Sequence, residues 1–449
     1  MGAAHISYDV DFLAACRHAP DLFPFLLESA ARGGAQGRYD FLFARPDPEM
    51  LVLHADGRLT GPHAEEAGGD FLTALDGWWR TERTRAKGAE GSAFRGGFFL
   101  YLGYELVGQV EQNLRLTPGR DLPVAFAARA PAALVRDHLA GTVNWVAEPG
   151  SEALLERLAV ILGQGPVPET AVLAGGLAEE EPGRYLDQVT RARRYIYEGD
   201  IFQANLSRHW SAALAPEATP TGLYARLRRA NPAPFAGLAL YGDAAIISSS
   251  PERLVSVTGR RVDTRPIAGT RPRGPDPARD AALIRELIEN PKERAEHVML
   301  LDMERNDLGR LAEPGSVRVD ELMVVESYTH VHHIVSNVCA RLREGTTPAQ
   351  VIRAVFPGGT ITGCPKVRCM QIIAELEQAS REAYTGAMGW LNLDGDMDLN
   401  ILIRTLVQKG RRLTFRAGAG IVADSVPERE LEETRAKARG LARALGGDA

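Results

Sequence analysis

Cysteine is scarce in this chain. Its 449 residues include only four cysteines, Cys16, Cys339, Cys364 and Cys369. None of them forms a C-x-x-C pair or a zinc-binding spacing, so the sequence predicts neither a dithiol redox motif nor a cysteine metal site. Four scattered thiols in so long a chain also favour a reducing compartment, and we expect the protein to be cytoplasmic.

Long apolar runs and an excess of positive charge are also missing. No apolar stretch approaches the roughly 20 residues that a membrane-spanning helix needs. The N-terminal sequence MGAAHISYDVDF has neither the basic nor the apolar region of a secretion signal. The net charge of −6 argues against nucleic acid or an anionic membrane as a partner, so any anion site must be a local basic pocket.

The composition is that of a globular protein, with 45% hydrophobic and 24% charged residues. A segment rich in glycine, proline, alanine and glutamate, residues 163–183, is the predicted linker. It divides the chain into an N-terminal domain, residues 1–165, and a C-terminal domain, residues 184–449. Strand-like runs follow one another in antiparallel-looking series with helices between them, which favours an α+β fold over a doubly wound parallel sheet.

Two strand predictions apply to defined residue ranges. Residues 244–259 and 260–269 resemble the two arms of a β-hairpin, and residues 321–342 are predicted to form one long strand because β-branched residues are frequent in them.

Paired glutamates occur in two predicted helices. Glu293 and Glu296 lie three residues apart in the helix 289–307, and Glu430 and Glu433 have the same spacing in a C-terminal helix. Residues three apart share a helix face. Two helices that each present paired carboxylates are suited to one Mg²⁺ ion, which prefers a few carboxylates together with water and substrate oxygens.

Spacing alone leaves other interpretations of these glutamates open. Asn290 is the predicted N-cap before Pro291, and Glu293 has the position of its capping-box partner. Glu433 and Lys437 have the spacing of an exposed helical ion pair, which stabilises a helix by only about 0.2–0.5 kcal/mol.

A glycine-rich stretch, FPGGTITGCPKVRCMQ, resembles a phosphate-binding P-loop but lacks its lysine, because Cys364 follows Gly363. A turn that leads into a helix N-terminus remains, and free backbone N–H groups there favour an anion such as a carboxylate. An ordinary loop–helix junction is the alternative. Arg404 lies in an apolar strand, where a buried guanidinium needs a partner and can bind a carboxylate through two parallel hydrogen bonds.

Eight motifs between residues 185 and 445 resemble, in content and order, the chorismate-utilising enzyme family. They are GDIFQANLS, SSSPERL, TRPIAGTRPRG, ERAEHVMLLDMERNDLGR, FPGGTITGCPK, GDMDLNILIRT, GAGIVADSVPE and EETRAKA. FLLESA, GRYDF and FLYLGYELVG extend the resemblance to the branch that obtains ammonia from a glutamine amidotransferase. This implies an α+β fold like that of anthranilate synthase component I, with antiparallel sheets in an intertwined sandwich and outer helices.

The resemblance implies a cleft that holds chorismate and Mg²⁺. Glu296 and Glu433 match the direct Mg²⁺ ligands, with Glu293 and Glu430 beside them. The residues that match positions holding the substrate, or that line its pocket, are Gly269, Thr360, Tyr384, Arg404, Gly420 and Lys437.

Two further residues match catalytic positions of the family. Glu252 resembles the acid that protonates the departing C4 hydroxyl, and to donate near neutral pH its pKa must be raised by burial or by nearby carboxylates. His333 matches a histidine that the anthranilate branch needs for a later elimination step. A packed strand histidine is the alternative for His333.

Gln203 and Ala268 lie at the two positions whose residue type indicates the nucleophile. Family members that add water to chorismate carry a lysine base where this chain has Gln203, so we expect ammonia to be the nucleophile instead. Most aminodeoxychorismate synthases carry PIKGT, whose lysine attacks the ring, whereas anthranilate synthases carry PIAGT. Ala268 has the lysine's position and favours anthranilate, whereas Asn205 in QANLS, together with NPAPF, FPGG, TITG and GDMDLNILIRT, favours aminodeoxychorismate.

We therefore expect a PIAGT-type aminodeoxychorismate synthase reaction, on the path to 4-aminobenzoate and folate, with anthranilate synthesis as the alternative. The chain has no nucleophilic cysteine elbow of the amidotransferase type and no lyase module, so ammonia supply and pyruvate elimination are expected from partner proteins. The N-terminal motifs resemble a tryptophan-binding region, which leaves tryptophan as a possible ligand. A non-enzymatic alternative is a tryptophan-binding or scaffold protein with a decayed site.

Overall fold

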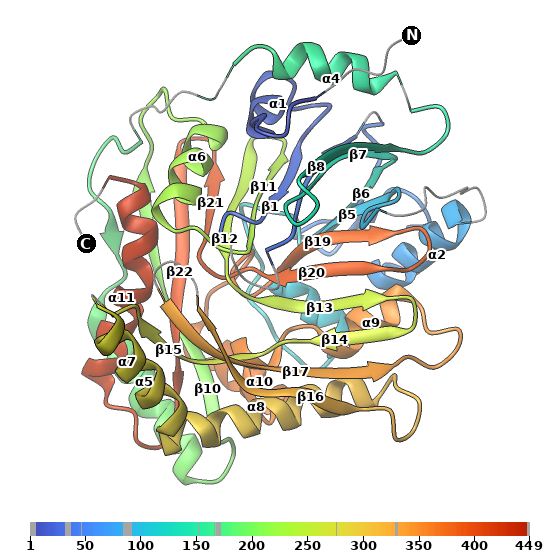
Figure 1. The fold of residues 1–449 in the computed structure, drawn as a ribbon. Coiled ribbons are helices and arrows are strands. Elements are labelled where there is room, and N and C mark those ends of the chain that lie inside the picture. Colours follow the sequence, from blue (N-terminus) through green and yellow to red (C-terminus); the bar gives the residue numbers. More distant parts are fainter. Residues whose placement is uncertain are drawn as a thin grey trace.

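Two antiparallel β-sheets form the framework of the protein in the computed structural model (Figure 1). It describes residues 6–446 except 32–36, 46, 84–91, 152, 166, 168–171, 275 and 328–330. All strand pairs within the described residues are antiparallel, as the sequence predicts for an α+β protein.

Sheet A has eleven strands in the described part of the chain, and β9 (Ala178–Glu179) pairs beside β10. In spatial order, its other strands are β18 (Gly363–Cys364), β10 (Gln203–Ala213), β22 (Arg412–Ile421), β21 (Thr405–Lys409), β12 (Ala244–Ser250), β11 (Phe235–Tyr241), β1 (Phe25–Glu28), β2 (Tyr39–Ala44), β7 (Ala132–Asp137) and β8 (Thr142–Ala147).

Sheet B likewise has eleven strands among the described residues, and β16 (Arg318–Ser327) pairs beside β17. Its other strands, in spatial order, are β15 (Ile267–Pro272), β17 (Val331–Arg341), β14 (Arg261–Thr264), β13 (Arg253–Thr258), β20 (Met397–Ile401), β19 (Ala387–Asn392), β5 (Gly97–Leu102), β6 (Ala125–Ala130), β3 (Met50–Leu53) and β4 (Leu59–Thr60).

The inner faces of the two sheets pack against each other. Phe25 of β1 stacks on Phe99 of β5 with ring centroids 4.1 Å apart. Side chains alternate between the faces of a strand, so Phe99 and Tyr101 belong to this inner core, whereas Phe98 and Leu100 face the helices on the other side of sheet B. Burial on both faces explains why the run GFFLYL of β5 is apolar throughout.

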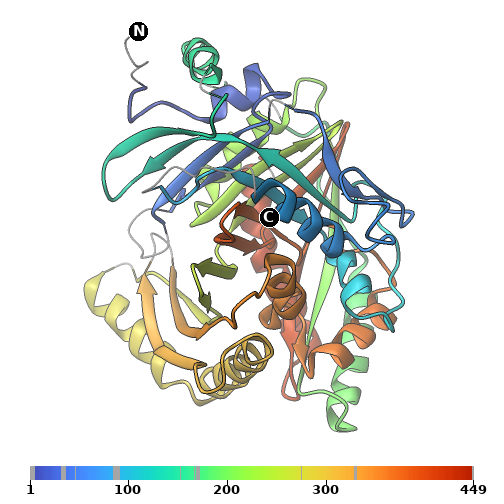
Figure 2. The same ribbon diagram turned by 90° about the vertical axis from the view of Figure 1, so that its right-hand side faces the viewer.

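Helices cover the outer faces. Sheet A packs against α1, α4, α5, α6, α10 and α11, and sheet B against α2, α8 and α9. In Figure 2, α7 and α8 lie together with the golden strands β16 and β17 at the lower left. The helices are α1 (Leu13–His18), α2 (Phe71–Arg83), α3 (Val107–Val110), α4 (Leu154–Leu162), α5 (Pro182–Tyr197), α6 (Pro220–Ala230), α7 (Pro277–Glu289), α8 (Pro291–Gly309), α9 (Pro348–Val355), α10 (Lys366–Glu377), α11 (Pro427–Ala444) and the 3-10 turns η1 (Tyr104–Leu106) and η2 (Gly359–Ile361).

Both sheets combine strands from before residue 165 and after residue 184. In sheet A, β1 pairs with β11, and in sheet B, β5 pairs with β19. The two segments therefore share one framework, and the division of the chain at the predicted linker stays a prediction. None of the described helices is long and apolar enough to span a bilayer.

Two sequence predictions need correction. The long strand expected at residues 321–342 is a pair of antiparallel strands, β16 and β17, because the chain reverses between Ser327 and Val331. The first arm of the hairpin expected at residues 244–269 is broken at Pro251, where the chain leaves β12 of sheet A and enters β13 of sheet B. The hairpin that does form joins β13 to β14.

Candidate active site

A cleft of about 710 Å³ opens between β10 and β22 at one end of sheet A and β15 and β17 at one end of sheet B. Helices α8 and α11 contribute the remaining wall. The predicted site residues that line this cleft are Gln203, Ala268, Gly269, Glu293, Glu296, His333, Thr360, Arg404, Gly420, Glu430, Glu433 and Lys437. Residues separated by more than 200 positions thus meet in one place, and Glu252 and Tyr384 are the predicted residues outside this lining.

Helix α8 places the first pair of glutamates. It begins at Pro291, directly after Asn290, whose side-chain Oδ1 accepts a hydrogen bond of 3.3 Å from the backbone N–H of Glu293. This confirms the predicted N-cap. Oε1 of Glu293 accepts a 2.7 Å ion-pair hydrogen bond from Arg271, whereas its buried Oε2 has no hydrogen-bond partner among the described residues.

Helix α11 places the second pair. Lys437 forms the predicted ion pair with Glu433 at 2.7 Å, and its Nζ also donates a 3.0 Å hydrogen bond to the backbone carbonyl of Gly418. Both side chains of the ion pair are partly exposed, so the pair itself contributes little to stability. Its effect is to hold the Lys437 ammonium over the end of β22 and beside the cleft.

The four glutamates have the donor chemistry that Mg²⁺ prefers, carboxylate oxygens from two helices. The buried Oε2 of Glu293, which lacks a hydrogen-bond partner in the described chain, also fits a cation nearby. No three of these carboxylates among the described residues have oxygens within 4.8 Å of one another. The donor chemistry of these glutamates therefore fits a divalent cation, which they would hold by carboxylate oxygens.

Glu252 lies at a crossing between the two sheets, in the short connection from β12 to β13. It is 6% exposed, and its Oε1 has no hydrogen-bond partner in the described part of the chain. Burial and the nearby Glu304 carboxyl raise the pKa of Glu252 to about 7, against a lowering by the hydroxyl of Thr360. A pKa near neutrality lets Glu252 carry a proton at neutral pH, as general-acid chemistry requires.

Arg404 lies at a second crossing, between β20 of sheet B and β21 of sheet A. Burial lowers the pKa of its guanidinium, and Tyr384 partly offsets this. No carboxylate among the described residues forms an ion pair with it, and its backbone is left-handed, with a φ of 54°. A strained residue that aims an uncompensated cation into a cleft is characteristic of a ligand site.

Glycines shape the wall around Gln203 and Glu293. A Cβ at Gly420 would lie 2.3 Å from the amide nitrogen of Gln203, and a Cβ at Gly269 would lie 2.5 Å from Oε2 of Glu293. Gly269 also has a φ of 70°, which favours glycine. Side chains at these two positions would therefore displace predicted site residues.

His333 and Ala268 face the cleft from sheet B. Burial lowers the pKa of His333 to about 4, so the ring is neutral at neutral pH, and its Nδ1 lies 2.9 Å from the hydroxyl of Thr270. Ala268 is 8% exposed and packs with Leu300 and Met303. The cleft therefore offers a neutral imidazole but no amine nucleophile at position 268.

Tyr384 lies behind the cleft wall. Its hydroxyl is 2.6 Å from the place of a Cβ on Gly418, and burial raises the pKa of the phenol to about 12. The neutral phenol packs against β22, its ring lies 5.5 Å from the Arg381 guanidinium, and it lines a separate pocket.

The sequence does not identify two buried glutamates, Glu304 on α8 and Glu377 at the end of α10. Both occur in charged helical segments that resemble solvent-exposed faces. Only the packing of α8 on η2 and of α10 on sheet A shows that they are inside.

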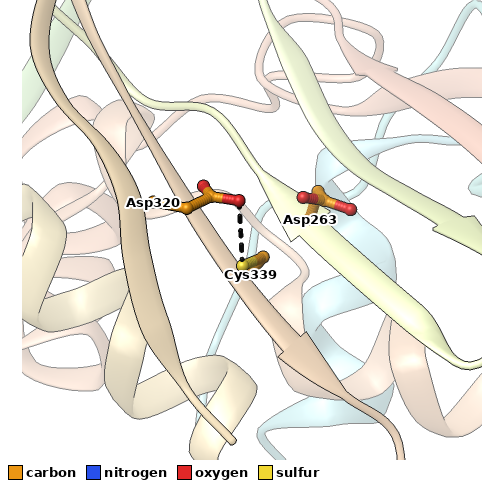
Figure 3. Close-up of side chains that lie close together, drawn as sticks. All are labelled: Asp263, Asp320 and Cys339. Carbon is orange, nitrogen blue, oxygen red and sulfur yellow. Dashed lines mark hydrogen bonds between the residues drawn. The ribbon is translucent and has the colours of Figure 1, made fainter.

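A separate acidic cluster lies in sheet B. Figure 3 shows Asp263, Asp320 and Cys339, whose ligand atoms lie within 4.8 Å of one another. Arg261 pairs with Asp263 at 2.6 Å and with Asp320 at 2.7 Å, and Asn337 donates hydrogen bonds to both carboxylates. Arg261 therefore compensates part of the charge of the cluster, and the cluster joins β14, β16 and β17.

Comparisons with known proteins agree with this geometry. The family model for chorismate binding enzymes matches residues 41–443. Aminodeoxychorismate synthase component 1 of Bacillus subtilis (strain 168) is 41% identical over 441 residues, covering 94% of this chain and 91% of that protein. Anthranilate synthase component 1 of Streptomyces coelicolor is 41% identical over 450 residues, covering 95% and 84%. The crystal structure of anthranilate synthase component I from Streptococcus pneumoniae TIGR4 has 32% identity and a TM-score of 0.78, covering 91% of this chain and 92% of that one.

Proposed function

This chain belongs to the family of chorismate binding enzymes, and we propose that it aminates chorismate to 4-amino-4-deoxychorismate with ammonia as the nucleophile. The observation that carries the proposal is that two complementary groups serve one cleft. Arg404, a buried cation without a carboxylate partner in the described chain, lines the cleft, and Glu252, a buried acid whose pKa is about 7, lies next to Thr360 of its lining. One group binds an anion and the other delivers a proton beside it.

Binding begins with the carboxylates of chorismate. Arg404 binds one of them through two parallel hydrogen bonds, and the Lys437 ammonium adds positive charge at the end of β22. Glu296 and Glu433, with Glu293 and Glu430 beside them, would hold Mg²⁺, whose positive charge neutralises and fixes a carboxylate of the ring.

Glu252 then acts as the general acid. It donates its proton to the C4 hydroxyl, which leaves as water. Gln203 cannot remove a proton from an attacking water molecule because an amide is not a base at neutral pH. Ammonia needs no such activation, which favours amination over hydration.

The absence of a lysine at Ala268 affects the route but not the acid step. In the PIKGT enzymes the lysine attacks ring carbon C2 before ammonia enters at C4. In this protein we propose that a first ammonia attacks C2 as the C4 hydroxyl leaves as water, and that a second ammonia then attacks C4 and displaces the C2 amine as ammonia. Ala268 leaves space for the smaller nucleophile between Leu300 and the cleft.

Anthranilate synthesis is the second candidate, and His333 favours it. This neutral imidazole faces the cleft, as an elimination step after amination at C2 would require. Ala268 is compatible with the same product, and relatives with both names share 41% identity with the chain.

Partner proteins are proposed from the names of the relatives. Relatives named component 1 imply a second component, and we propose a glutamine amidotransferase that supplies ammonia. A separate aminodeoxychorismate lyase would form 4-aminobenzoate for folate synthesis. Tryptophan, if it binds, would do so near Glu28 and Ser29.

Product identity tests the proposal. Purified protein is incubated with chorismate, Mg²⁺ and an ammonium salt, with and without added aminodeoxychorismate lyase, and the products are separated by chromatography. We expect 4-aminobenzoate only when the lyase is present, and no product when a chelator removes Mg²⁺. Anthranilate fluorescence without lyase would replace the first candidate by the second. No consumption of chorismate with a folded protein would contradict both and support a non-catalytic role.

A further inference from the structure

A second buried carboxyl lies behind the candidate acid. Glu304 of α8 is 6% exposed, like Glu252, and no lysine or arginine among the described residues forms an ion pair with it. Helix α8 packs on η2, where a Cβ at Gly359 would lie 3.4 Å from Oε1 of Glu304. The next residue, Thr360, lines the cleft beside Glu252.

A threonine hydroxyl lies beside each of these carboxyls. Thr360 lies next to Glu252, and Thr264 of β14 lies next to Glu304. Both hydroxyl oxygens are buried, and within the described chain neither makes a well-formed hydrogen bond. Buried polar groups without partners are rare in native proteins, so three such groups close together, the two threonine hydroxyls and Oε1 of Glu252, indicate a functional arrangement.

The Glu304 end of this arrangement reaches the surface. Asp307, one turn after Glu304 on α8, is 3% exposed and forms an ion pair with Lys366. Asp307, Lys366 and Met303 line a separate pocket of about 600 Å³ on the outer side of α8. Met303 packs with Leu300 and Ala268, which form the apolar wall between this pocket and the cleft.

We propose that Glu304 is a positioning residue that shares protons with Glu252 and restores the proton of Glu252 from the solvent side of α8 while substrate fills the cleft. The inference rests on the proposed function, since it concerns the same acid. Its physical basis is that two neighbouring buried carboxyls cannot both ionise cheaply, so the pair retains a proton.

Protons balance in this scheme. Glu252 gives its proton to the departing hydroxyl, which leaves as water, and becomes a carboxylate. Glu304 passes a proton to Glu252 through the hydroxyl of Thr360 and is reprotonated from solvent near Asp307 and Lys366. The proton that ammonia loses when it becomes the bound amine returns to solvent.

The charges around the two carboxyls agree with the shared proton. Burial and the Asp307 carboxylate together raise the pKa of Glu304 to about 7, against a lowering by Lys366. Glu252 has a similar pKa, raised by burial and Glu304 and lowered by Lys437. Removing the Glu304 charge must therefore lower the pKa of Glu252.

Glu304→Gln tests the inference by the pH dependence of chorismate consumption at a fixed concentration of free ammonia. Because general acid catalysis needs protonated Glu252, the basic limb of kcat should move down by about one pH unit, which is about a tenfold loss on that limb. KM for chorismate should not change.

Two control variants accompany this test. Glu304→Asp should restore part of the shift, and Asp302→Asn, which removes an exposed carboxylate from the same helix, should leave the pH profile unchanged. An unchanged basic limb in Glu304→Gln overturns the inference.

A second measurement does not need turnover or that variant. Infrared difference titration of wild type and Glu252→Gln follows the protonated carboxyl of Glu304 directly. Coupling is reciprocal, so loss of Glu252 should lower the titration midpoint of Glu304 by about one pH unit. An unchanged midpoint overturns the inference even in a catalytically active protein. A shifted midpoint in a protein that does not consume chorismate supports the carboxyl pair while contradicting the proposed function.

Discussion

Glu252 and Glu377 are both buried glutamates, yet their surroundings differ completely. Glu377 receives hydrogen bonds from Arg381 at 2.6 and 2.9 Å, from Arg416 at 3.2 Å and from the backbone and hydroxyl of Ser207 at 2.8 and 2.9 Å. Burial alone would raise its pKa, but these cations and hydrogen bonds hold the pKa below the ordinary value. Glu252 has no cation beside it except Lys437, the weakest influence on it, and its pKa rises.

The difference shows that the hydrogen-bond partners of a buried glutamate decide whether it stabilises the fold or can act as an acid. Glu377 is a completed ion cluster that ties the end of α10 to β10 and β22. Glu252 has a buried oxygen without a hydrogen-bond partner in the described chain, at a crossing between the sheets where substrate can supply that partner. Buried polar groups without partners lower the stability of the fold, and they persist where function requires them.

The largest expected effect is on turnover in Glu252→Gln. Loss of a general acid lowers kcat by roughly 10²- to 10⁴-fold, and chorismate consumption should fall accordingly with little change in KM. Stability should change in the opposite direction. The folded-state pKa of about 7 lies above the unfolded value of 4.5, so wild-type Glu252 destabilises the fold increasingly as pH rises through that window.

Urea denaturation of this variant completes the test. Glu252→Gln should be more stable than wild type at pH 8, by up to about 3 kcal/mol, and equally stable at pH 4. A loss of stability at pH 8 would mean that Glu252 is a structural residue like Glu377.

Glu377→Gln should give the reverse result. Removing one member of a buried ion cluster leaves two uncompensated guanidinium groups and typically costs about 3–5 kcal/mol. The folded-state pKa is lowered, so the stabilisation by Glu377 is present above the unfolded value of 4.5 and is lost as pH falls through the folded pKa. Urea denaturation should therefore show a large deficit at pH 7 that shrinks in acid. Activity per folded molecule should stay within a few-fold of wild type, and a selective loss of turnover would contradict the comparison.

Arg404 extends the comparison from acids to a base, and its substitution should have a smaller effect. Arg404→Gln removes a charged hydrogen-bonding group worth about 1.5–3 kcal/mol, so KM for chorismate should rise roughly 10- to 100-fold. Stability should not fall, because the guanidinium has no ion-pair partner in the described chain. Arg416→Gln, which removes a paired arginine, is the matched control and should lower stability instead. Equal destabilisation by both variants would show that Arg404 is structurally compensated.

The sequence predicted the features of the fold and the site that depend on neighbouring residues, but not those that depend on contacts between distant segments. Helical spacing placed Glu293, Glu296, Glu430 and Glu433 on two helix faces, and the α+β fold and the N-cap at Asn290 were confirmed. Local patterns did not show that α8 and α11 meet at one cleft, and only the family resemblance implied it. The break at Pro251 was missed because strand propensity continues across it, although the chain changes sheets there.

Burial of single residues in charged helices was not predictable. In DMERND, Glu304 and Asp307 are buried while Asp302 and Arg305 are exposed. The two kinds of residue alternate with the helical period, but no local feature indicates which face packs against η2. Tertiary contacts decide that, and with them the chemistry of Glu304.

The smallest expected effect concerns tryptophan and a third buried glutamate, Glu28. Arg228 donates hydrogen bonds of 3.0 and 3.1 Å to its carboxylate, and the hydroxyl of Ser29 lies 3.0 Å from the carbonyl of Tyr39 and 3.2 Å from that of Pro234. Burial raises the pKa of Glu28, unlike that of Glu377, but Glu28 and Ser29 already have partners within the protein, so an amino acid would have to break existing hydrogen bonds to bind them. We therefore expect saturating tryptophan to change the rate of chorismate consumption by less than about twofold, because each displaced hydrogen bond offsets a new one. Inhibition by tenfold or more, abolished in Ser29→Ala, would show that internal pairing does not exclude a ligand, and the distinction drawn between Glu252 and Glu377 would then need more than hydrogen-bond completeness to support it.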